Sequence, residues 1–252
     1  MTMVYYAPCG YRCGNAGDMV AALLAEHVLG HPVTLASPEE ATLTTTGSIL
    51  HHLPETYSGV IWGSGLMFRD MEINLPNADI RCVRGPLTAA RVNGGLGPEV
   101  ALGDAALLAN ELPFPWSREK RYTVGVIPHY MDIDNEVVKE WLVGHPGTTS
   151  IDICGRVPDV LRAITECRYI LSSSLHGLIF ADALGVPGAW IVLSDLIAGG
   201  EFKFRDYYAV FGISPNPFPF HANMHPAEIL GYPWDRPGMD DIRGRLKECL
   251  LR

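Results

Sequence analysis

The sequence predicts an α/β fold built from two Rossmann-like domains that face a cleft. Short β-rich runs alternate with amphipathic stretches, which is the pattern of parallel α/β domains. The alternation stops at a Pro-rich stretch, residues 112–120, and then starts again. The chain has 252 residues, of which 48% are hydrophobic. It is therefore long enough and apolar enough to form such packed layers.

The first half begins as a strand, a glycine-containing loop and a helix. Residues 4–6 are the expected first strand, and residues 8–17 are a loop with glycines at positions 10, 14 and 17. Asp18 suits the N-cap of the helix, and Gly30 suits its C-terminal stop. Pro86 suits the first turn of a second helix. Further strands are expected at residues 59–62, 80–83 and 99–102.

The second half repeats this alternation after the linker. The linker at residues 112–120 predicts a boundary between a domain of residues 1–115 and a domain of residues 116–252. The last helix, residues 239–251, is expected to pack back on the first domain. Other strands are expected at 122–127, 150–154, 169–171 and 190–193, and other helices at 136–142, 157–167 and 175–184. Ligands of such sheets bind beyond the carboxyl ends of the strands, which points to the cleft.

The composition argues against nucleic-acid binding, secretion and membrane insertion. The formal net charge is −9, which disfavours a broad surface for nucleic acid. The N-terminus lacks a basic region followed by an apolar core, and the apolar runs are too short to span a bilayer. We therefore expect a cytoplasmic protein. Its cysteines fit no zinc spacing and are expected to be free thiols; they stand at positions 9, 13, 82, 154, 167 and 249.

The most informative motif follows the predicted strand at residues 169–171. Ser172, Ser173 and Ser174 precede Leu175 and His176, where a helix begins. Free backbone N–H groups and the dipole at a helix N-terminus attract phosphate or carboxylate, so these residues predict an anion site. His176 adds a group that exchanges protons near neutral pH. The alternative, a serine cap beside a histidine that binds backbone, is equally compatible with the spacing.

A second motif follows the first strand. Gly14 and Gly17, with Asn15 between them, let the backbone approach a ligand closely, and Asp18 follows. The motif lacks the full dinucleotide-binding pattern, and Asp18 suits a helix cap better than a catalyst.

Several cations and one histidine are further candidates for an anion site. Lys203 and Arg205 follow a Gly-Gly pair, and Arg84 ends a predicted strand. Guanidinium and ammonium groups bind phosphate and carboxylate, which suits an anionic substrate of an acidic protein. For Lys203 and Arg205 the favoured alternative is a solvated helix face. His129, after another strand, is a candidate acid or base, although a lone histidine there is more often structural.

Taken together, these motifs resemble the polysaccharide pyruvyl transferase family, in the branch that makes pyruvate ketals on bacterial exopolysaccharides. The resemblance covers positions 14–208. Its residues are Gly14-Asn15-Ala16-Gly17-Asp18, Val83-Arg84-Gly85-Pro86-Leu87-Thr88, Gly103-Asp104, Ile127-Pro128-His129, Ser172 to Gly177, Ala181 to Pro187, and Lys203 to Tyr208.

The resemblance implies a fold like that of GT-B glycosyltransferases and transfer of a pyruvyl group from phosphoenolpyruvate to a sugar diol. The product would be a pyruvate ketal on an exopolysaccharide repeat unit, with release of phosphate and without a cofactor or metal. It implies a phosphoenolpyruvate side in the second domain and an acceptor side in the first. The acceptor would be a lipid-linked oligosaccharide, met by peripheral contact at the inner face of the plasma membrane.

Roles for the candidate residues follow from this chemistry. His176 is expected to be the principal acid–base or phosphate-contacting group, with Asp18 and His129 as secondary candidates. Arg84, Lys203 and Arg205 form the expected anion clamp. The remaining expected substrate contacts are Asn15, Gly17, Ser172, Ser173, Ser174 and Leu175.

The chain departs from the family at position 174, and two other functions remain compatible with its sequence. Many family members have Arg-Leu-His where this chain has Ser174-Leu175-His176, so we expect Lys203 or Arg205 to supply the missing charge. A glycosyltransferase that uses a nucleotide sugar is one alternative, although no acidic residue for a ribose is identifiable. A non-catalytic scaffold of polysaccharide assembly is the other.

Overall fold

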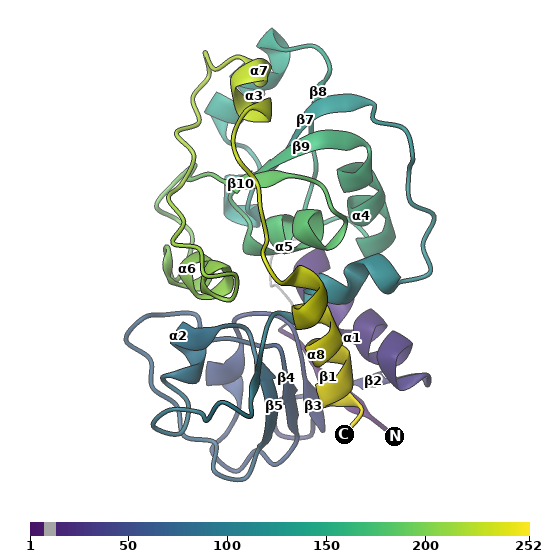
Figure 1. The fold of residues 1–252 in the computed structure, drawn as a ribbon, viewed down its shortest axis with the longest axis vertical. Coiled ribbons are helices and arrows are strands. Elements are labelled where there is room, and N and C mark those ends of the chain that lie inside the picture. Colours follow the sequence, from purple (N-terminus) through teal and green to yellow (C-terminus); the bar gives the residue numbers. More distant parts are fainter. Residues whose placement is uncertain (8–13) are drawn as a thin grey trace.

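The computed structural model describes residues 1–7 and 14–252 and contains two parallel sheets (Figure 1). The larger sheet has six strands in the order β2-β1-β3-β4-β5-β6, and the smaller has four in the order β10-β9-β7-β8. The strands of the larger sheet are β1 (Met3–Tyr5), β2 (Thr34–Leu35), β3 (Leu43–Thr44), β4 (Val60–Trp62), β5 (Asp79–Val83) and β6 (Ala101–Leu102). Those of the smaller are β7 (Tyr122–Ile127), β8 (Thr148–Ser150), β9 (Cys167–Ser172) and β10 (Gly188–Trp190).

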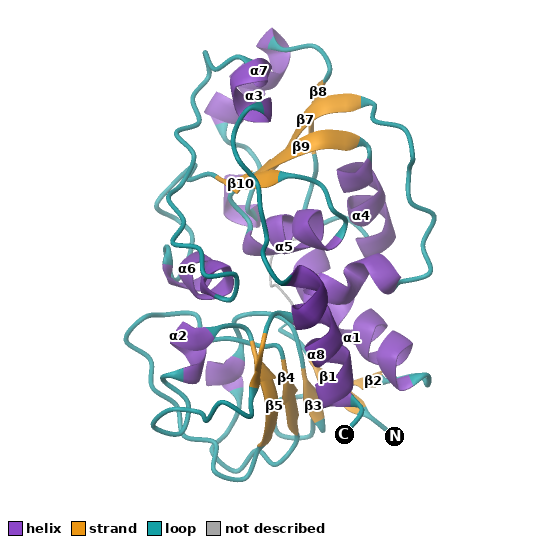
Figure 2. Ribbon diagram, in the orientation of Figure 1, coloured by secondary structure: helices purple, strands orange, loops and turns teal. Residues whose placement is uncertain are grey.

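Helices connect and cover the strands (Figure 2). The α-helices are α1 (Ala16–Leu29), α2 (Pro86–Ala89), α3 (Glu136–Gly144), α4 (Val157–Thr165), α5 (Leu175–Ala183), α6 (Phe202–Ala209), α7 (Pro226–Leu230) and α8 (Met239–Leu250). Short 3-10 helices lie at η1 (Leu50–His52), η2 (Ala105–Glu111) and η3 (Tyr130–Asp132). The predicted parallel α/β fold is confirmed.

The register of the sheets brings the ends of neighbouring strands together. In the smaller sheet, Ile127 at the end of β7 pairs with Ser172 at the end of β9. In the larger sheet, Val83 at the end of β5 pairs with Leu102 at the end of β6. The polar residues that follow these strands therefore emerge side by side at the carboxyl edge of each sheet.

The hydrophobic core joins the two halves of the chain. One cluster of buried side chains includes Val20 and Leu24 of α1 together with Leu161 of α4 and Phe180 of α5. The amide of Ala16 also donates a hydrogen bond of 2.8 Å to the carbonyl of Ile153. Because this core is shared, the division at residues 115 and 116 and the GT-B-like arrangement stay predictions.

The last helix lies on the larger sheet. Helix α8 packs against β4, β5 and β6 (Figure 1). The indole Nε1 of Trp62 donates a hydrogen bond of 2.7 Å to the carbonyl of Leu246, and Arg81 donates one of 2.8 Å to the carbonyl of Leu250. The C-terminal residues thus contribute directly to the packing of the N-terminal half.

Some sequence-based boundaries need correction. Asp18 is not the N-cap of the first helix, because α1 begins at Ala16 and the side chain of Asn15 accepts the hydrogen bond from Gly17 N–H. Gly30 does end this helix in the left-handed conformation, with φ of 73°. The strand expected at 150–154 lies earlier, at β8, and the strand expected at 190–193 ends at Trp190.

Residues 112–121, which include the predicted linker, form neither helix nor strand. Among the described residues, Cys82, Cys167 and Cys249 are free thiols, as predicted. Cys9, Cys13 and most of the predicted loop at residues 8–17 lie outside the described residues.

Candidate functional site

A cavity of about 200 Å³ lies at the carboxyl ends of strands from both sheets. Arg84 follows β5 and Asp104 follows β6, while His129 follows β7 and Ser174 follows β9. This is the edge where open parallel sheets bind ligands. The remaining lining residues are Ala7, Asn15, Asp18, Gly47, Ser48, Ile49, His52, Met67, Tyr130, Leu175, His176, Ala198 and Lys203.

His176 occupies the first turn of α5 and lines this cavity. Its Nε2 is buried and has no hydrogen-bond partner among the described residues. Burial lowers the pKa of His176 to about 3, helped by the positive charges of Arg84 and Lys203. The imidazole is therefore neutral at pH 7. A neutral ring with an unpaired nitrogen in a cavity is ready to exchange a proton or a hydrogen bond with a ligand.

The position of His176 depends on a close contact with α1. A Cβ atom added to Gly17 would lie 2.0 Å from Nδ1 of His176. Only glycine leaves room for the ring at this place. Gly17 therefore packs against the imidazole and does not itself line the cavity, whereas the neighbouring Asn15 and Asp18 do line it.

Lys203 projects into the cavity from α6 and is only 6% exposed. Within residues 1–7 and 14–252, no hydrogen bond or ion pair reaches its ammonium group. Burial lowers the pKa of Lys203 to about 8, as does the charge of Arg84, while Asp18 opposes this shift. The ammonium is thus mostly charged at pH 7 and unpaired, which suits it to an anionic ligand.

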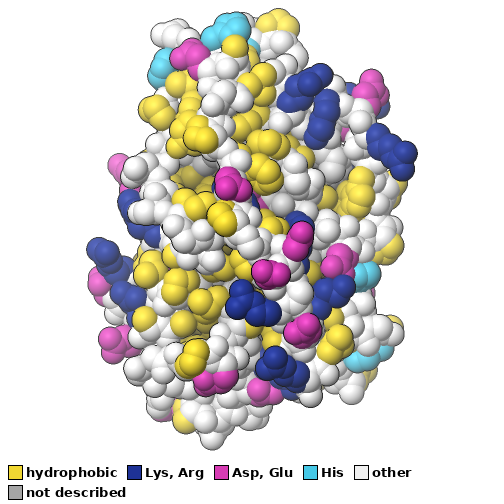
Figure 3. All heavy atoms as spheres, viewed as in Figure 1, with side chains coloured by type: hydrophobic (Ala, Val, Ile, Leu, Met, Phe, Trp, Pro, Cys, Tyr) yellow, Lys and Arg dark blue, Asp and Glu magenta, His cyan; other side chains and the backbone are white. Residues whose placement is uncertain are grey.

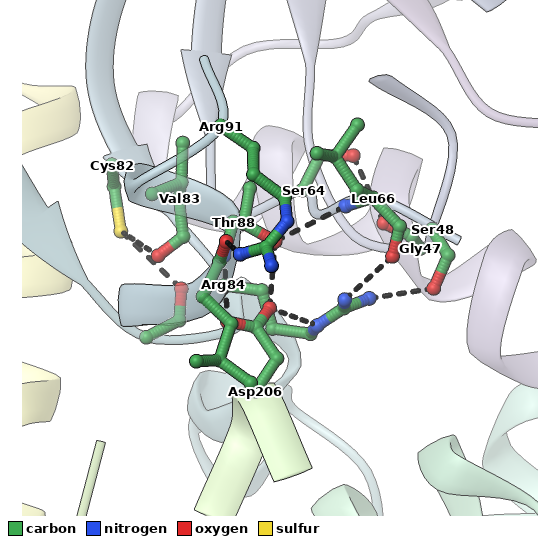
Figure 4. A network of polar contacts seen from close by, with 12 residues as sticks. Gly47, Ser48, Ser64, Leu66, Cys82, Val83, Arg84, Thr88, Arg91 and Asp206 are labelled. Atoms are coloured by element: carbon green, nitrogen blue, oxygen red, sulfur yellow. Dashed lines mark hydrogen bonds and ion pairs between the residues drawn. The ribbon is translucent and has the colours of Figure 1, made fainter. Parts of the chain in front are cut away.

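Arg84 is fully buried, and its guanidinium is held in place by partners of the protein (Figure 4). Its Nε donates to Asp206 at 3.0 Å, Nη2 donates to the Leu66 carbonyl at 2.7 Å, and Nη1 donates to Ser48 Oγ. Asp206 also accepts from the amide and hydroxyl of Thr88. Because Asp206 belongs to α6, this ion pair fixes the helix that carries Lys203. Arg84 therefore positions Lys203 and contributes positive potential.

Two carboxyl groups share the cavity with Lys203. Burial raises the pKa of Asp18 to about 7, with Lys203 opposing the rise and Asp104 adding to it. Burial also raises the pKa of Asp104 to about 7, although its Oδ1 accepts a hydrogen bond from Ala106 N–H. Its Oδ2 is buried without a partner in the described part of the chain. Both groups are poised to hold or release a proton near neutral pH.

His129 lines the cavity but also has structural contacts. Its Nδ1 accepts a hydrogen bond of 3.3 Å from Met131 N–H, so it caps the short helix η3. Burial lowers the pKa of His129 to about 3, and the charge of Lys203 adds to this effect. Like His176, it is neutral at pH 7.

The serine motif divides into residues that face the cavity and residues that shape the turn. Ser174 and Leu175 line the cavity. Ser172 Oγ instead donates to the carbonyl of Ile127 and accepts a hydrogen bond from Ser174 N–H. Ser173 Oγ donates to the carboxylate of Asp132 and accepts from His129 N–H. Ser172 and Ser173 were predicted to contact substrate, but their hydroxyls form these internal bonds and neither residue lines the cavity.

Arg205 was predicted to join the anion clamp, and the structure separates it from the other members. Its guanidinium forms an ion pair of 2.7 Å with Glu201 and lines a different cavity. Lys203 and Arg205 are two positions apart on α6, and residues at this spacing do not share a helix face. Of the two cations, only Lys203 reaches the cavity of His176.

Asp104 lines the cavity but was not predicted as a site residue. The signal was present, because Gly103-Asp104 follows a predicted strand in the same way as Arg84. Ser48 and His52 were also missed, since the two-residue strand β3 that precedes them gives almost no periodicity. A cluster of His, Cys, Asp and Glu side chains that could hold a metal is absent from the described residues. Within the same part of the chain, every helix is too short or too polar to cross a membrane.

Comparison with known proteins adds family evidence to this geometry. Residues 60–195 match the polysaccharide pyruvyl transferase family. This region contains the strands and turns that supply Arg84, Asp104, His129 and His176.

Two relatives align with most of the chain. The chain is 31% identical over 210 residues to the succinoglycan biosynthesis protein ExoV of Rhizobium meliloti, across 81% of this chain and 64% of ExoV. It thus spans less than two thirds of that relative. It is 29% identical over 223 residues to the uncharacterized protein L143 of Acanthamoeba polyphaga mimivirus, across 83% of this chain and 75% of L143. The chain therefore belongs to the polysaccharide pyruvyl transferase family.

Proposed function

We propose that this protein transfers a pyruvyl group from phosphoenolpyruvate to a sugar diol of an exopolysaccharide repeat unit. The observation that carries the proposal is that two side chains lining one cavity have polar groups without a hydrogen-bond partner. His176 and Lys203 both line the cavity at the start of α5, and among the described residues neither the buried Nε2 of His176 nor the ammonium of Lys203 has a hydrogen-bond partner. Family membership and the resemblance to ExoV support it.

Phosphoenolpyruvate fits this cavity in charge. Its phosphate and carboxylate require positive groups in an otherwise acidic protein. Lys203 supplies a direct contact, the buried Arg84 supplies potential, and the free N–H groups at the start of α5 add donors. Lys203 thereby takes over the charge that many family members place at the position of Ser174.

The reaction needs one proton donor and a base. A proton added to C3 of phosphoenolpyruvate makes C2 electrophilic, one sugar hydroxyl then adds to C2, and its proton passes to a base. Loss of phosphate and attack by the second hydroxyl then close the ketal, and the proton of this hydroxyl passes to the departing phosphate, so that one phosphate is released for each ketal formed. A group with a pKa close to the working pH serves best in such transfers.

Residues of the cavity match these roles. Asp18 and Asp104, each with a pKa raised to about 7 by burial, are partly protonated at neutral pH and suit the donor. The neutral His176 suits the base, and the ring becomes easier to protonate when an anionic substrate offsets the charges of Arg84 and Lys203. The backbone of Gly17 packs against this ring, and Leu175 lines the cavity beside it.

We further propose that the acceptor is a lipid-linked oligosaccharide and that the protein works in the cytoplasm at the inner face of the plasma membrane. In such a setting, no cofactor other than the donor substrate is required, since proton transfer and charge stabilisation supply the chemistry.

Mass spectrometry tests the proposal. The protein is incubated with phosphoenolpyruvate and candidate lipid-linked oligosaccharides, and the saccharide is examined for a pyruvate ketal. A ketal with matching phosphate release is the expected result. Transfer of a sugar with nucleotide release would instead identify a glycosyltransferase. The absence of both reactions across the acceptor panel would favour a scaffold.

A further inference from the structure

A second cavity of about 260 Å³ lies between α2, α6 and the loop after β4. Three arginines and one glutamate line it: Arg69, Arg91, Arg205 and Glu201. In a chain with a net charge of −9, these four side chains carry a net charge of +2. We call this place the arginine cavity. Figure 3 shows Lys and Arg side chains interspersed with Asp and Glu side chains at the edge of the molecule that carries α2 and α6, beside apolar surface.

Arg91 is held in a fixed orientation in the arginine cavity. Its Nε donates to the carbonyl of Arg69 at 2.7 Å, and its Nη1 donates to the carbonyl of Leu87 at 2.9 Å. The guanidinium also lies over the ring of Phe202, 5.4 Å from the ring centroid. Nη2 remains without an acceptor in the described part of the chain. A guanidinium fixed in this way loses little conformational entropy when it binds an anion.

The other two arginines differ in their pairing. Arg205 is neutralised by Glu201, at 2.7 Å, and donates to the carbonyl of Pro215 at 3.3 Å. The exposed guanidinium of Arg69 forms no hydrogen bond or ion pair with any described residue. Arg69 and Arg91 thus account for the surplus positive charge of the cavity.

The arginine cavity and the cavity of His176 lie on two sides of α6. Lys203 lines the His176 cavity, whereas the adjacent Phe202 lines the arginine cavity. The loops at their rims also touch, because a Cβ added to Gly199 would lie 2.1 Å from the carbonyl oxygen of Met67. The diameter of an α-helix, about 10–12 Å, sets the scale of their separation. A ligand that reaches both cavities must therefore be longer than phosphoenolpyruvate.

We propose that the arginine cavity binds a diphosphate ester group of the sugar acceptor, which rests on the proposed function. The guanidinium fork matches phosphate oxygens, and the net charge of +2 balances the two negative charges of a diphosphate diester. An extended acceptor anchored there reaches past the rim formed by Met67 and Gly199 toward the donor cavity. The subsite thereby selects acceptors that carry phosphate and orients their sugar toward His176.

Calorimetry with inorganic pyrophosphate and with geranyl diphosphate tests the subsite. Both probes are titrated into the wild-type protein and into the Arg69→Glu, Lys203→Ala and Arg118→Glu variants. Arg118 is exposed and outside both cavities, so Arg118→Glu makes the same change of charge elsewhere. We expect Arg69→Glu to raise both dissociation constants roughly tenfold or more, on the scale of a lost charge-assisted contact. Lys203→Ala and Arg118→Glu should each change them far less.

Each other outcome overturns the proposal. Loss of binding in Lys203→Ala alone would assign the diphosphate to the His176 cavity. An equal loss of affinity in Arg118→Glu would show that the probes respond only to the overall charge of the protein and not to the arginine cavity. Binding of free pyrophosphate without geranyl diphosphate would reject an esterified ligand, and no binding in the wild type would reject the subsite. Because none of these titrations requires phosphoenolpyruvate turnover, failure of the proposed reaction remains distinguishable from failure of the subsite.

Discussion

Gly17 and His176 are in such close contact that any side chain at position 17 would displace the imidazole. A Cβ atom there would lie 2.0 Å from Nδ1 of His176, far inside van der Waals contact. Helix α1 of the first half and helix α5 of the second half thus meet at the imidazole. The contact fixes the ring that faces the cavity, so the glycine of the first motif serves the histidine of the second.

Substitution of Gly17 is expected to reduce turnover without unfolding the protein. In Gly17→Ala the methyl group displaces the imidazole, and small displacements of a reacting group cost about a hundredfold in rate. The control is Gly244→Ala in α8, where an added Cβ meets no atom within 4 Å. Turnover of phosphoenolpyruvate and the melting temperature are measured for both. Equal turnover in the two variants would contradict the positioning role.

Lys203, and not Arg205, is expected to determine the affinity for phosphoenolpyruvate. Lys203→Ala should raise the dissociation constant roughly ten- to a hundredfold, the range for one charge-assisted contact of about 1.5–3 kcal/mol. Lys139→Ala is the control, because Lys139 is an exposed lysine paired with Glu136. Calorimetry at pH 7 measures each constant. A larger effect of Arg205→Ala than of Lys203→Ala would contradict the geometry, since Arg205 lines the other cavity.

Asp104 is expected to alter the pH dependence of stability. Its pKa is raised from 3.8 to about 7 by burial, so the folded state binds more protons than the unfolded state between these values. The contribution of this group to the free energy of unfolding is therefore complete at low pH and is lost as the pH rises toward and through 7. In Asp104→Asn this loss disappears.

The measurement is denaturant unfolding at a series of pH values between 4 and 7. The free energy of unfolding of Asp104→Asn should rise relative to wild type as the pH increases. Asp240→Asn on the exposed side of α8 is the control and should follow the wild type. A difference between Asp104→Asn and wild type that stays constant with pH would show that Asp104 does not titrate in this range.

The ion pair between Arg84 and Asp206 is expected to be required for stability. Asp206→Ala leaves a buried, unpaired guanidinium and also removes the acceptor of Thr88, so we expect a loss of about 3–5 kcal/mol. The exposed pair between Asp79 and Arg81 is the comparison, for which Asp79→Ala should cost less than about 1 kcal/mol. Chemical denaturation measures both. Equal losses would mean that α6 is held mainly by its apolar contacts.

The elements with strong local patterns were predictable from the sequence. Strand β7 and the start of helix α5 lie where the β-rich run and the serine motif indicate, and β7 has the predicted bounds. Both signals are local, because they depend on residues within one or two turns or on one strand. His176, at the start of such a helix, was therefore a candidate from the local pattern, although a structural role was equally compatible with the spacing.

Other features depend on contacts that no local pattern contains. Arg84 and Asp206 are 122 positions apart, and their pairing depends on how α6 packs. The same packing separates Lys203 from Arg205, which look equivalent in the sequence. Asn15 and Asp18 are both good helix caps by type, and only the burial of the turn decides that Asn15 caps and Asp18 faces the cavity.

The central claim is that His176 performs pyruvyl transfer from phosphoenolpyruvate in this cavity. The most direct test is phosphate release from phosphoenolpyruvate, with ketal formation on the acceptor, for wild type and folded His176→Ala. His31→Ala, at an exposed histidine, is the control. The account predicts coupled phosphate and ketal formation by wild type and His31→Ala, and a rate at least about a hundredfold lower for His176→Ala. Near-normal turnover by a folded His176→Ala protein would contradict it.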